Sequence, residues 1–290
     1  MEQNFYRILI TGANGQLGSE LQGLIGKNEN YLFATRKDLD ICNKKQLESY
    51  ISSNKIGLII NCAGYTNVDK AEEDFNTAKN INVTGVNTIS NIAHKNNIFL
   101  IHISTDYVFD GSSKIPYKES DSTNPISLYG KTKRDGELEV IKSKANSIII
   151  RTAWLYSKNY GKNFLKTMIR LGKEREEINV VNDQFGTPTN AKDLANCILH
   201  MIKQIDSTNS WNKYKGEIYN YTNEGSCTWY EFAKTIMETH HIDCKVHPIT
   251  TEEYPTTAKR PANSILSKEK IKREFGITIP QWKESLQDPS

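Results

Sequence analysis

The chain has 290 residues, which suffices for one large or two modest domains with a buried core. Its hydrophobic fraction of 37% and charged fraction of 24% are typical of a globular protein, and the net charge is only +3. So small and evenly spread an excess argues against nucleic acid or an anionic membrane as a partner.

The cysteines and the apolar runs indicate the compartment. Five cysteines stand at irregular spacing without a C-x-x-C pair, so the sequence gives no zinc or dithiol signature. Scattered free thiols suit a reducing cytosol. There is no charged leader with a cleavage-like site, and no apolar run reaches the roughly 18 to 20 residues that span a bilayer. We therefore expect a cytoplasmic protein that does not enter membranes.

The first half of the chain alternates short apolar runs with amphipathic stretches. The runs predict strands at residues 8–10, 31–34, 58–60, 98–103 and 147–150, and the stretches between them predict helices such as 16–25 and 71–94. Continuous apolar strands separated by helices indicate a parallel sheet that is covered on both faces. The predicted fold class is α/β, with a Rossmann-type doubly wound parallel sheet.

The pattern changes after residue 153. Helical periodicity continues at 163–171, 191–202 and 228–239, but the apolar runs shorten and loops with Pro and Gly become frequent. We therefore expect an NADP-binding Rossmann domain at residues 1–153 and a smaller, mostly helical substrate-binding domain at residues 154–290. The sequence does not define the boundary between them sharply, and some segments after residue 153 are expected to rejoin the first domain.

A glycine-rich turn links the first predicted strand to the first predicted helix. Gly12, Gly15 and Gly18 follow the strand in a G-x-x-G-x-x-G spacing. Glycines at this place permit a tight turn and close approach of the backbone to a pyrophosphate, and the helix N-terminus adds unpaired N–H groups. The turn therefore predicts a dinucleotide site.

The ends of the second and third strands refine the cofactor prediction. NAD sites usually have an acidic residue at the end of the second strand, whereas this chain has Thr35, Arg36 and Lys37 there. Two cations suit a 2′-phosphate, so NADPH is preferred, although NADH remains an alternative. Asp40 is placed to approach the adenine. The third strand ends in small residues, Ala63 and Gly64, which let a cofactor cross the sheet edge.

Candidate catalytic groups follow the fourth strand. Thr105 is placed to hydrogen-bond a substrate oxygen, and Tyr129 and Lys133 lie four residues apart on one predicted helical face. We expect the ammonium of Lys133 to lower the pKa of the phenol, which would then donate a proton during carbonyl reduction. Tyr230 and Lys234 have the same spacing but lie far from any strand edge, so we interpret them as a surface pair.

These motifs resemble the extended short-chain dehydrogenase/reductase superfamily and, within it, the dTDP-4-dehydrorhamnose reductase family. The resemblance rests on the glycine turn, residues 104–109, the Tyr129/Lys133 pair, and further stretches at 68–72, 151–154, 163–164, 182–189 and 260–264. It covers residues from about 7 to 265. The later stretches belong to the substrate half of the family, which makes the resemblance specific.

The resemblance implies an enzyme of dTDP-rhamnose and polysaccharide biosynthesis. The reaction would reduce the 4-keto group of dTDP-4-dehydro-β-L-rhamnose, a dTDP-linked deoxysugar, with hydride from NADPH. Tyr129 would donate the proton, Lys133 would bind the nicotinamide ribose, and Arg260 would pair with the diphosphate. The implied substrate-binding residues are Thr105, Asp106, Trp154, Asn163, Gln184 and Arg260.

The expected cofactor contacts combine the glycine turn, the second and third strand ends and the catalytic pair. They are Gly12, Asn14, Gly15, Gln16, Leu17, Gly18, Thr35, Arg36, Asp40, Ile41, Ala63, Gly64, Tyr65, Tyr129 and Lys133.

One departure from the family concerns a metal. Some members are described as dimers bridged by Mg²⁺ through glutamates, and Glu20 matches one such position, but Lys192 stands at a second. A cation there would repel Mg²⁺, so we expect no metal and either a monomer or a homodimer. Two alternative functions stay open: a non-catalytic NADP-binding regulatory subunit, and a reductase or epimerase of another nucleotide sugar.

Overall fold

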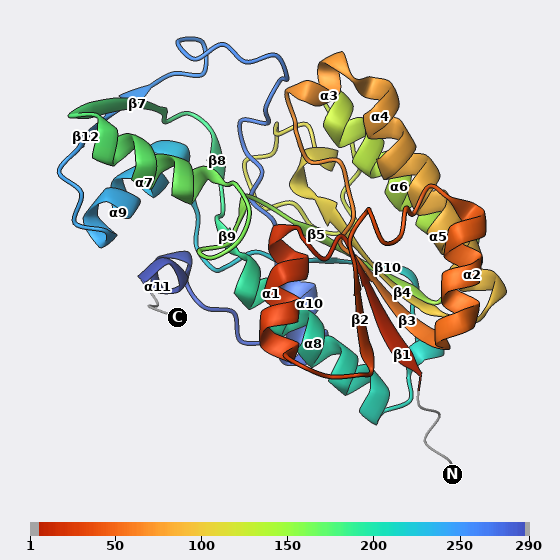
Figure 1. Ribbon diagram of the computed structural model, residues 1–290. Helices are drawn as coiled ribbons and strands as arrows, with labels where there is room; N and C mark the ends of the chain where they lie inside the picture. The colour runs from red at the N-terminus through yellow and green to blue at the C-terminus, as the bar shows by residue number, and fades with distance from the viewer. Residues whose placement is uncertain (1–5, 288–290) are drawn as a thin grey trace.

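The computed structural model describes residues 6–287; residues 1–5 and 288–290, the outer ends of the two expected domains, lie outside it. Its centre is a parallel sheet with the strand order β10-β5-β4-β3-β1-β2 (Figure 1). The six strands are β1 (Arg7–Thr11), β2 (Tyr31–Ala34), β3 (Ile56–Asn61), β4 (Phe99–Thr105), β5 (Ser147–Thr152) and β10 (Lys215–Asn220). This sheet confirms the predicted fold class, and β10 shows that a segment after residue 153 joins it.

Alternate residues of the strands supply two separate cores, as period-2 geometry requires. On one face Ile10, Ile60 and Ile101 pack against α1 (Gln16–Ile25), α8 (Ala191–Ser207) and α10 (Glu269–Phe275). On the other face Leu9 and Ile59 pack against α2 (Lys44–Asn54), α5 (Val86–Lys95) and α6 (Leu128–Ser143). Figure 1 shows these two groups of helices on opposite sides of the sheet. The central residues of β1, β3 and β5 are apolar because both faces of the sheet are covered.

The single helix expected at residues 71–94 was a wrong prediction. The segment consists of α3 (Lys70–Glu73), α4 (Phe75–Lys79), the π-helical turn η1 (Asn80–Gly85) and α5. The break occurs at Asp74, whose carboxylate caps α4 by accepting from Thr77 N. Within η1, Asn82 bonds both backbone polar groups of Tyr65 and the hydroxyl of Thr132 on α6. Such wide turns interrupt a helix without a sequence signal that periodicity would detect.

A second lobe extends beyond the carboxyl edge of the sheet (Figure 1). Its core joins Phe232, Trp282 and Leu165. It contains α7 (Phe164–Glu174), α9 (Trp229–Thr239), α11 (Trp282–Gln287) and three small strand pairs: β6 (Leu155–Tyr156) with β9 (Thr189–Asn190), β7 (Glu177–Val181) with β12 (Lys245–Ile249), and β8 (Phe185–Gly186) with β11 (Cys227–Thr228). Outside this lobe, η2 (Asp106–Val108) directly follows β4 and η3 (Trp211–Lys213) precedes β10, and both are 3-10 turns.

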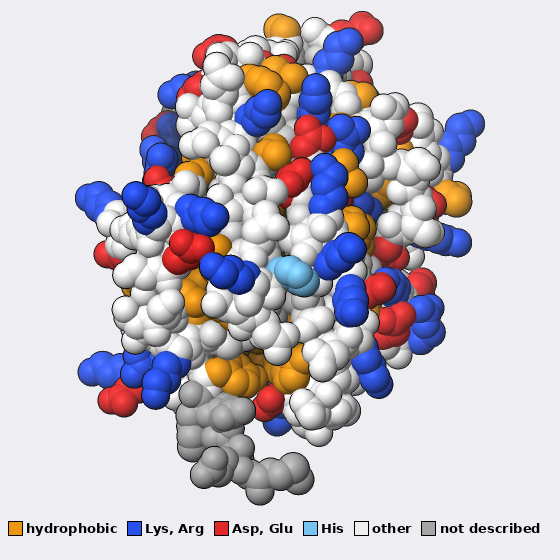
Figure 2. Space-filling model, turned by 90° about the vertical axis from the view of Figure 1, so that its right-hand side faces the viewer, with side chains coloured by type: hydrophobic (Ala, Val, Ile, Leu, Met, Phe, Trp, Pro, Cys, Tyr) orange, Lys and Arg blue, Asp and Glu red, His pale blue; other side chains and the backbone are white. Residues whose placement is uncertain are grey.

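The chain passes between the lobes more than once, since α8, β10 and α10 return to the sheet. The expected division at residue 153 into a cofactor-binding and a substrate-binding domain therefore stays a prediction. Within residues 6–287 no helix is long and apolar enough to cross a membrane. On the face shown in Figure 2, Lys and Arg side chains are interspersed with Asp and Glu side chains, in keeping with the small net charge.

Candidate functional site

A cleft of about 1050 Å³ runs along the carboxyl edge of the sheet. One end is lined by the glycine turn and the ends of β2 and β3, and the middle by the end of β4 and by α6. The other end is lined by Trp154, Trp229 and Arg260 from the second half of the chain. Ligands of doubly wound sheets bind at this edge, so the cleft is the candidate site.

Two glycines of the turn are fitted too closely to their neighbours for a side chain. Gly12 has a φ of +65°, and a Cβ there would lie 2.7 Å from Ala63 N. A Cβ on Gly18 would lie 2.5 Å from Gly12 O. Gly15 begins α1 as its N-cap, and no side chain caps that end. The first-turn N–H groups therefore face the cleft, and this arrangement fits the pyrophosphate of a dinucleotide.

The adenosine end is marked by Arg36 and Asp40. Both line the cleft, and Arg36 Nε lies 3.9 Å from Asp40 Oδ2 while its side chain is 69% exposed. The guanidinium is thus accessible to a phosphate. Thr35 is not among the lining residues, because its hydroxyl is turned to Asp38, to which it donates at 2.7 Å. Every other expected cofactor contact lines the cleft.

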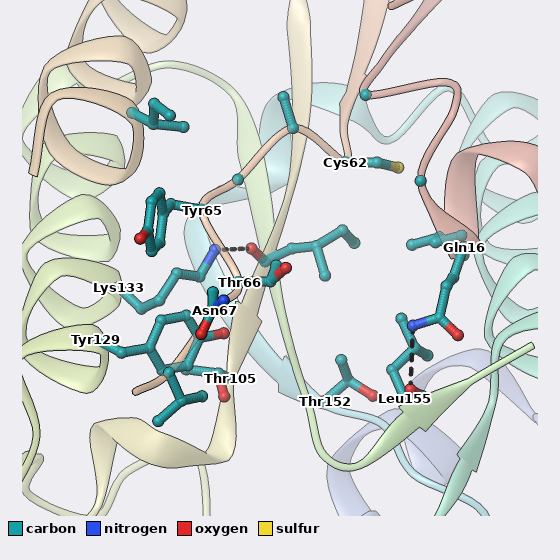
Figure 3. A pocket seen from close by; sticks show the side chains of 18 of the residues that line it. Gln16, Cys62, Tyr65, Thr66, Asn67, Thr105, Tyr129, Lys133, Thr152 and Leu155 are labelled. Atoms are coloured by element: carbon teal, nitrogen blue, oxygen red, sulfur yellow. Dashed lines mark hydrogen bonds between the residues drawn. The ribbon is translucent and has the colours of Figure 1, made fainter. Parts of the chain in front are cut away.

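The three expected catalytic residues converge in the middle of the cleft (Figure 3). Tyr129 and Lys133 extend from one face of α6 toward Thr105 at the end of β4. Lys133 Nζ donates to Ile103 O at 2.6 Å. The hydroxyl of Thr105 donates to Asp106 Oδ1 at 2.9 Å. Gly130 lets α6 approach this strand end, since a Cβ there would meet Tyr107 O.

The electrostatics of the pair differ from the sequence prediction. Burial raises the pKa of Tyr129 well above its ordinary value, a hydrogen bond with Thr105 opposes this, and the Asp106 charge adds to it. Burial lowers the pKa of Lys133 to about 8 against the raising effect of the Glu137 charge. The prediction that Lys133 lowers the phenol pKa was wrong, because its ammonium is directed to Ile103 O and both groups are buried. Tyr129 therefore keeps its proton at neutral pH.

Aromatic rings and a buried carboxyl form the far end. Trp154 lines the cleft in a left-handed conformation, with a φ of +46°, and stacks on Trp229 with ring centroids 3.5 Å apart. Asp106 is buried, and burial raises its pKa to about 6 against hydrogen bonds from Ser264 and Thr105. Trp229 was not predicted from sequence. The capping box of Thr228 and Glu231 could have marked it as the start of a helix, but not that it faces the cleft.

Arg260 lines the cleft but is already paired. Its guanidinium makes two hydrogen bonds to Asp69, of 2.6 and 3.1 Å, and Ala258 N also donates to that carboxylate. The ion pair joins the loop around residue 260 to the start of α3. The resemblance implied that Arg260 pairs with a diphosphate, but the sequence did not reveal this partner, which lies 191 residues away in the chain.

Two expected substrate residues do not line the cleft. Asn163 caps α7 by accepting from Lys166 N at 3.0 Å, and its amide donates to Gln16 Oε1 at 2.7 Å. Gln184 donates to Thr251 Oγ1 at 3.0 Å. Tyr230 and Lys234 lie on α9, with Tyr230 half-buried and Lys234 exposed, and neither lines the cleft.

The residues that match the Mg²⁺-bridging positions of some family members make other contacts or lie in a helix. Glu20 on α1 is buried and accepts from Ser157 Oγ at 2.5 Å. Lys192 lies in the first turn of α8. Over residues 6–287, no group of three His, Cys, Asp or Glu side chains is arranged to hold a metal ion.

Comparison with known proteins decides the family. A family model described as the RmlD substrate binding domain matches residues 6–289. The chain belongs to this family. The dTDP-4-dehydrorhamnose reductase of Aggregatibacter actinomycetemcomitans is 42% identical to this RmlD-family chain, over 97% of each sequence. The resemblance expected from the motifs is thereby confirmed.

Solved structures agree with this assignment. A dTDP-4-dehydrorhamnose reductase from Clostridium acetobutylicum matches the RmlD-family chain with a TM-score of 0.90 at 44% identity, and 97% of both chains is covered. The corresponding enzyme of Bacillus anthracis, whose structure is a complex with NADP, matches with a TM-score of 0.88 at 41% identity, again over 97% of both chains.

Proposed function

We propose that this chain reduces the 4-keto group of dTDP-4-dehydro-β-L-rhamnose to give dTDP-β-L-rhamnose, with NADPH as the reductant. The observation that carries this proposal is the convergence of Tyr129, Lys133 and Thr105 in a cleft that also contains the glycine turn. Relatives that match nearly the whole chain are named for this reaction.

The residues present fit NADPH. The uncapped N-terminus of α1 offers N–H groups for the pyrophosphate, and the exposed guanidinium of Arg36 suits a 2′-phosphate. The bound nicotinamide supplies the hydride for C4 of the sugar. Lys133 holds the nicotinamide ribose from the floor of the cleft, where Ile103 O already orients its ammonium.

Tyr129 supplies the proton. Its raised pKa keeps the phenol protonated at neutral pH, which is the form that donates to the developing alkoxide. Thr105 orients the phenol through their hydrogen bond. Its hydroxyl hydrogen is directed to ionised Asp106, so it becomes a donor to the carbonyl oxygen only when substrate replaces that acceptor.

The far end of the cleft binds the nucleotide sugar. Trp154 and Asp106 contact the sugar, and Arg260 exchanges part of its bonding with Asp69 for the diphosphate. Asn163 and Gln184 act from behind this lining. Asn163 orients Gln16, and Gln184 holds the loop at Thr251.

A matched pair of variants tests the proposal. Oxidation of NADPH and of NADH is followed with dTDP-4-dehydrorhamnose, generated by a coupled enzyme, for wild type, Tyr129→Phe and Tyr230→Phe. Tyr129→Phe removes only the proton donor, so we expect a loss of about 10² to 10⁴ in rate. Tyr230→Phe alters the pair of identical spacing and should be unchanged. Full activity of Tyr129→Phe would sink the mechanism.

Other outcomes separate the alternatives. Tight NADP binding without turnover would favour a regulatory subunit, and turnover of a different nucleotide sugar would favour another reductase or epimerase. Equal rates with both cofactors would refute the role of Arg36. We further propose a cytoplasmic monomer or homodimer that needs no Mg²⁺. Sedimentation velocity and activity assays, each with and without EDTA, test the oligomeric state and the metal requirement. A change in the sedimentation coefficient or a loss of activity on chelation would show that Mg²⁺ is needed and would overturn this proposal.

A further inference from the structure

A buried ion pair lies directly behind the catalytic residues. Arg151 NH2 is 2.7 Å from Glu137 Oε2, and Arg151 Nε donates to Glu137 Oε1 at 2.9 Å. Both side chains are only 3% exposed. Removing two charges from water costs about as much as their attraction returns, so such a pair is a poor source of stability. The main contribution of this pair is therefore the geometry that it imposes.

A third partner connects this pair to the catalytic strand. Ser104 Oγ donates to Glu137 Oε1 at 2.5 Å. Ser104 immediately precedes Thr105 on β4 and lies opposite Arg151 in the pairing of β4 with β5. The Glu137 carboxylate therefore joins α6 to two neighbouring strands at the level of Thr105.

Helix α6 holds the end of β4 at two consecutive residues. Lys133 Nζ donates to Ile103 O, and Glu137, one turn further along the helix, accepts from Ser104. Tyr129 is one turn before Lys133 on the same helix. The position of Thr105 relative to the phenol is thus set by how tightly Ser104 is held.

We propose that Glu137 is a positioning residue: with its charge balanced by Arg151, it holds Ser104 and so fixes Thr105 against Tyr129 and Lys133. This inference rests on the function proposed above. Glu137 itself does not line the cleft, so it acts through the residues that it holds.

Glu137 also balances the charge of Lys133. Its carboxylate raises the pKa of Lys133 and thereby opposes burial. Two neighbours that titrate near Lys133 are neutral, because burial raises the pKa of Cys62 to about 12 and lowers the pKa of His102 well below its usual range. Arg151 is a second cation beside the Glu137 carboxylate. Loss of the Glu137 charge would leave both cations without their shared anion.

Three variants separate positioning from stability. Glu137→Gln keeps the shape but removes the charge, and Ser104→Ala releases the strand while leaving the ion pair intact. The double variant Glu137→Leu/Arg151→Leu removes both charges, so that neither is left unpaired. Glu224→Gln is the control, because it also removes a carboxylate that pairs with a buried cation. Glu224 lies 3.4 Å from Lys268, whose side chain is 8% exposed, and neither residue lines the cleft.

Steady-state kinetics provide the first measurement. Ser104→Ala and the double variant should lose about 10- to 100-fold in kcat, because small misplacements of catalytic groups have effects of this size. The KM of Ser104→Ala for NADPH should stay within about twofold, because this variant keeps Glu137 beside Lys133 and changes no cofactor contact. Glu224→Gln should match wild type in both. Wild-type kcat in a folded double variant would overturn the proposal.

The second measurement does not depend on turnover. The pKa of Lys133 is followed by NMR in enzyme with ¹³C-labelled lysine, and Lys133→Met assigns the signal. Glu137→Gln should lower this pKa by about one pH unit, since an opposite charge is lost nearby. Glu224→Gln should leave it unchanged. An unshifted pKa in Glu137→Gln would refute the role of Glu137. Failure of the proposed function is a different result, because wild type itself would then show no turnover of the substrate.

Discussion

The low pKa of Lys133 predicts an alkaline limit to cofactor use. Burial lowers this pKa to about 8, whereas an exposed lysine titrates near 10.4. Above its pKa the ammonium fraction falls about tenfold per pH unit, so at pH 9 only about one tenth of the free enzyme carries the charge that holds the ribose. The raised pKa of Tyr129 keeps the phenol out of this range.

The assay is the pH dependence of kcat/KM for NADPH between pH 6 and pH 10, since this constant reports the ionisation of the free enzyme. We expect a break near pH 8 and a decline of about one log unit per pH unit above it. A flat profile up to pH 10 would refute the reasoning, because Lys133 would then titrate as if it were exposed.

The same group makes a prediction about stability with a definite sign. The folded state holds Lys133 at a lower pKa than the unfolded chain does, so the ammonium form opposes folding below pH 8. The unfolding free energy should rise as the pH passes from about 8 toward 10.4, by up to about 3 kcal/mol. Lys133→Met should therefore be inactive but more stable than wild type at pH 7, as urea unfolding would show. A less stable variant would contradict this.

Two further predictions concern the cleft. Burial raises the pKa of Asp106 to about 6, so the carboxylate form opposes folding and the unfolding free energy falls as the pH rises from about 4 to 6. Asp106→Asn should remove this pH dependence and, at pH 7, unfold at higher urea with reduced turnover; an unchanged pH profile of stability would argue against it. In the glycine turn, a Cβ on Gly18 would lie 2.5 Å from Gly12 O, whereas a Cβ on Gly15 would be 3.2 Å from it. Gly18→Ala should therefore lose about 1 to 3 kcal/mol of stability. Gly15→Ala should fold normally but bind NADP more weakly. Thermal melts and NADP titrations of both variants measure these effects, and a Gly15→Ala variant that is less stable than Gly18→Ala would contradict the prediction.

Local signals were sufficient for the cofactor half of the fold. The five strands of the first half were predicted from apolar runs, because strands that are buried on both faces consist mainly of apolar residues. The glycine turn was equally readable, since its spacing records close backbone contacts that only glycine permits. Helix α1 was predicted with its observed bounds. The break of the 71–94 segment was not, because one capping aspartate and a π-turn leave the helical periodicity intact.

The sequence by itself also placed Tyr129, Lys133 and Thr105 at one edge of the sheet, because spacing and strand order determine which residues meet there. It did not determine their ionisation, since the pKa of Tyr129 depends on burial and on the direction of the Lys133 ammonium. Nor did it reveal the Asp69 partner of Arg260 or the link from Ser104 to Glu137. These contacts join residues far apart in the chain, and only packing of the complete fold brings them within hydrogen-bond distance.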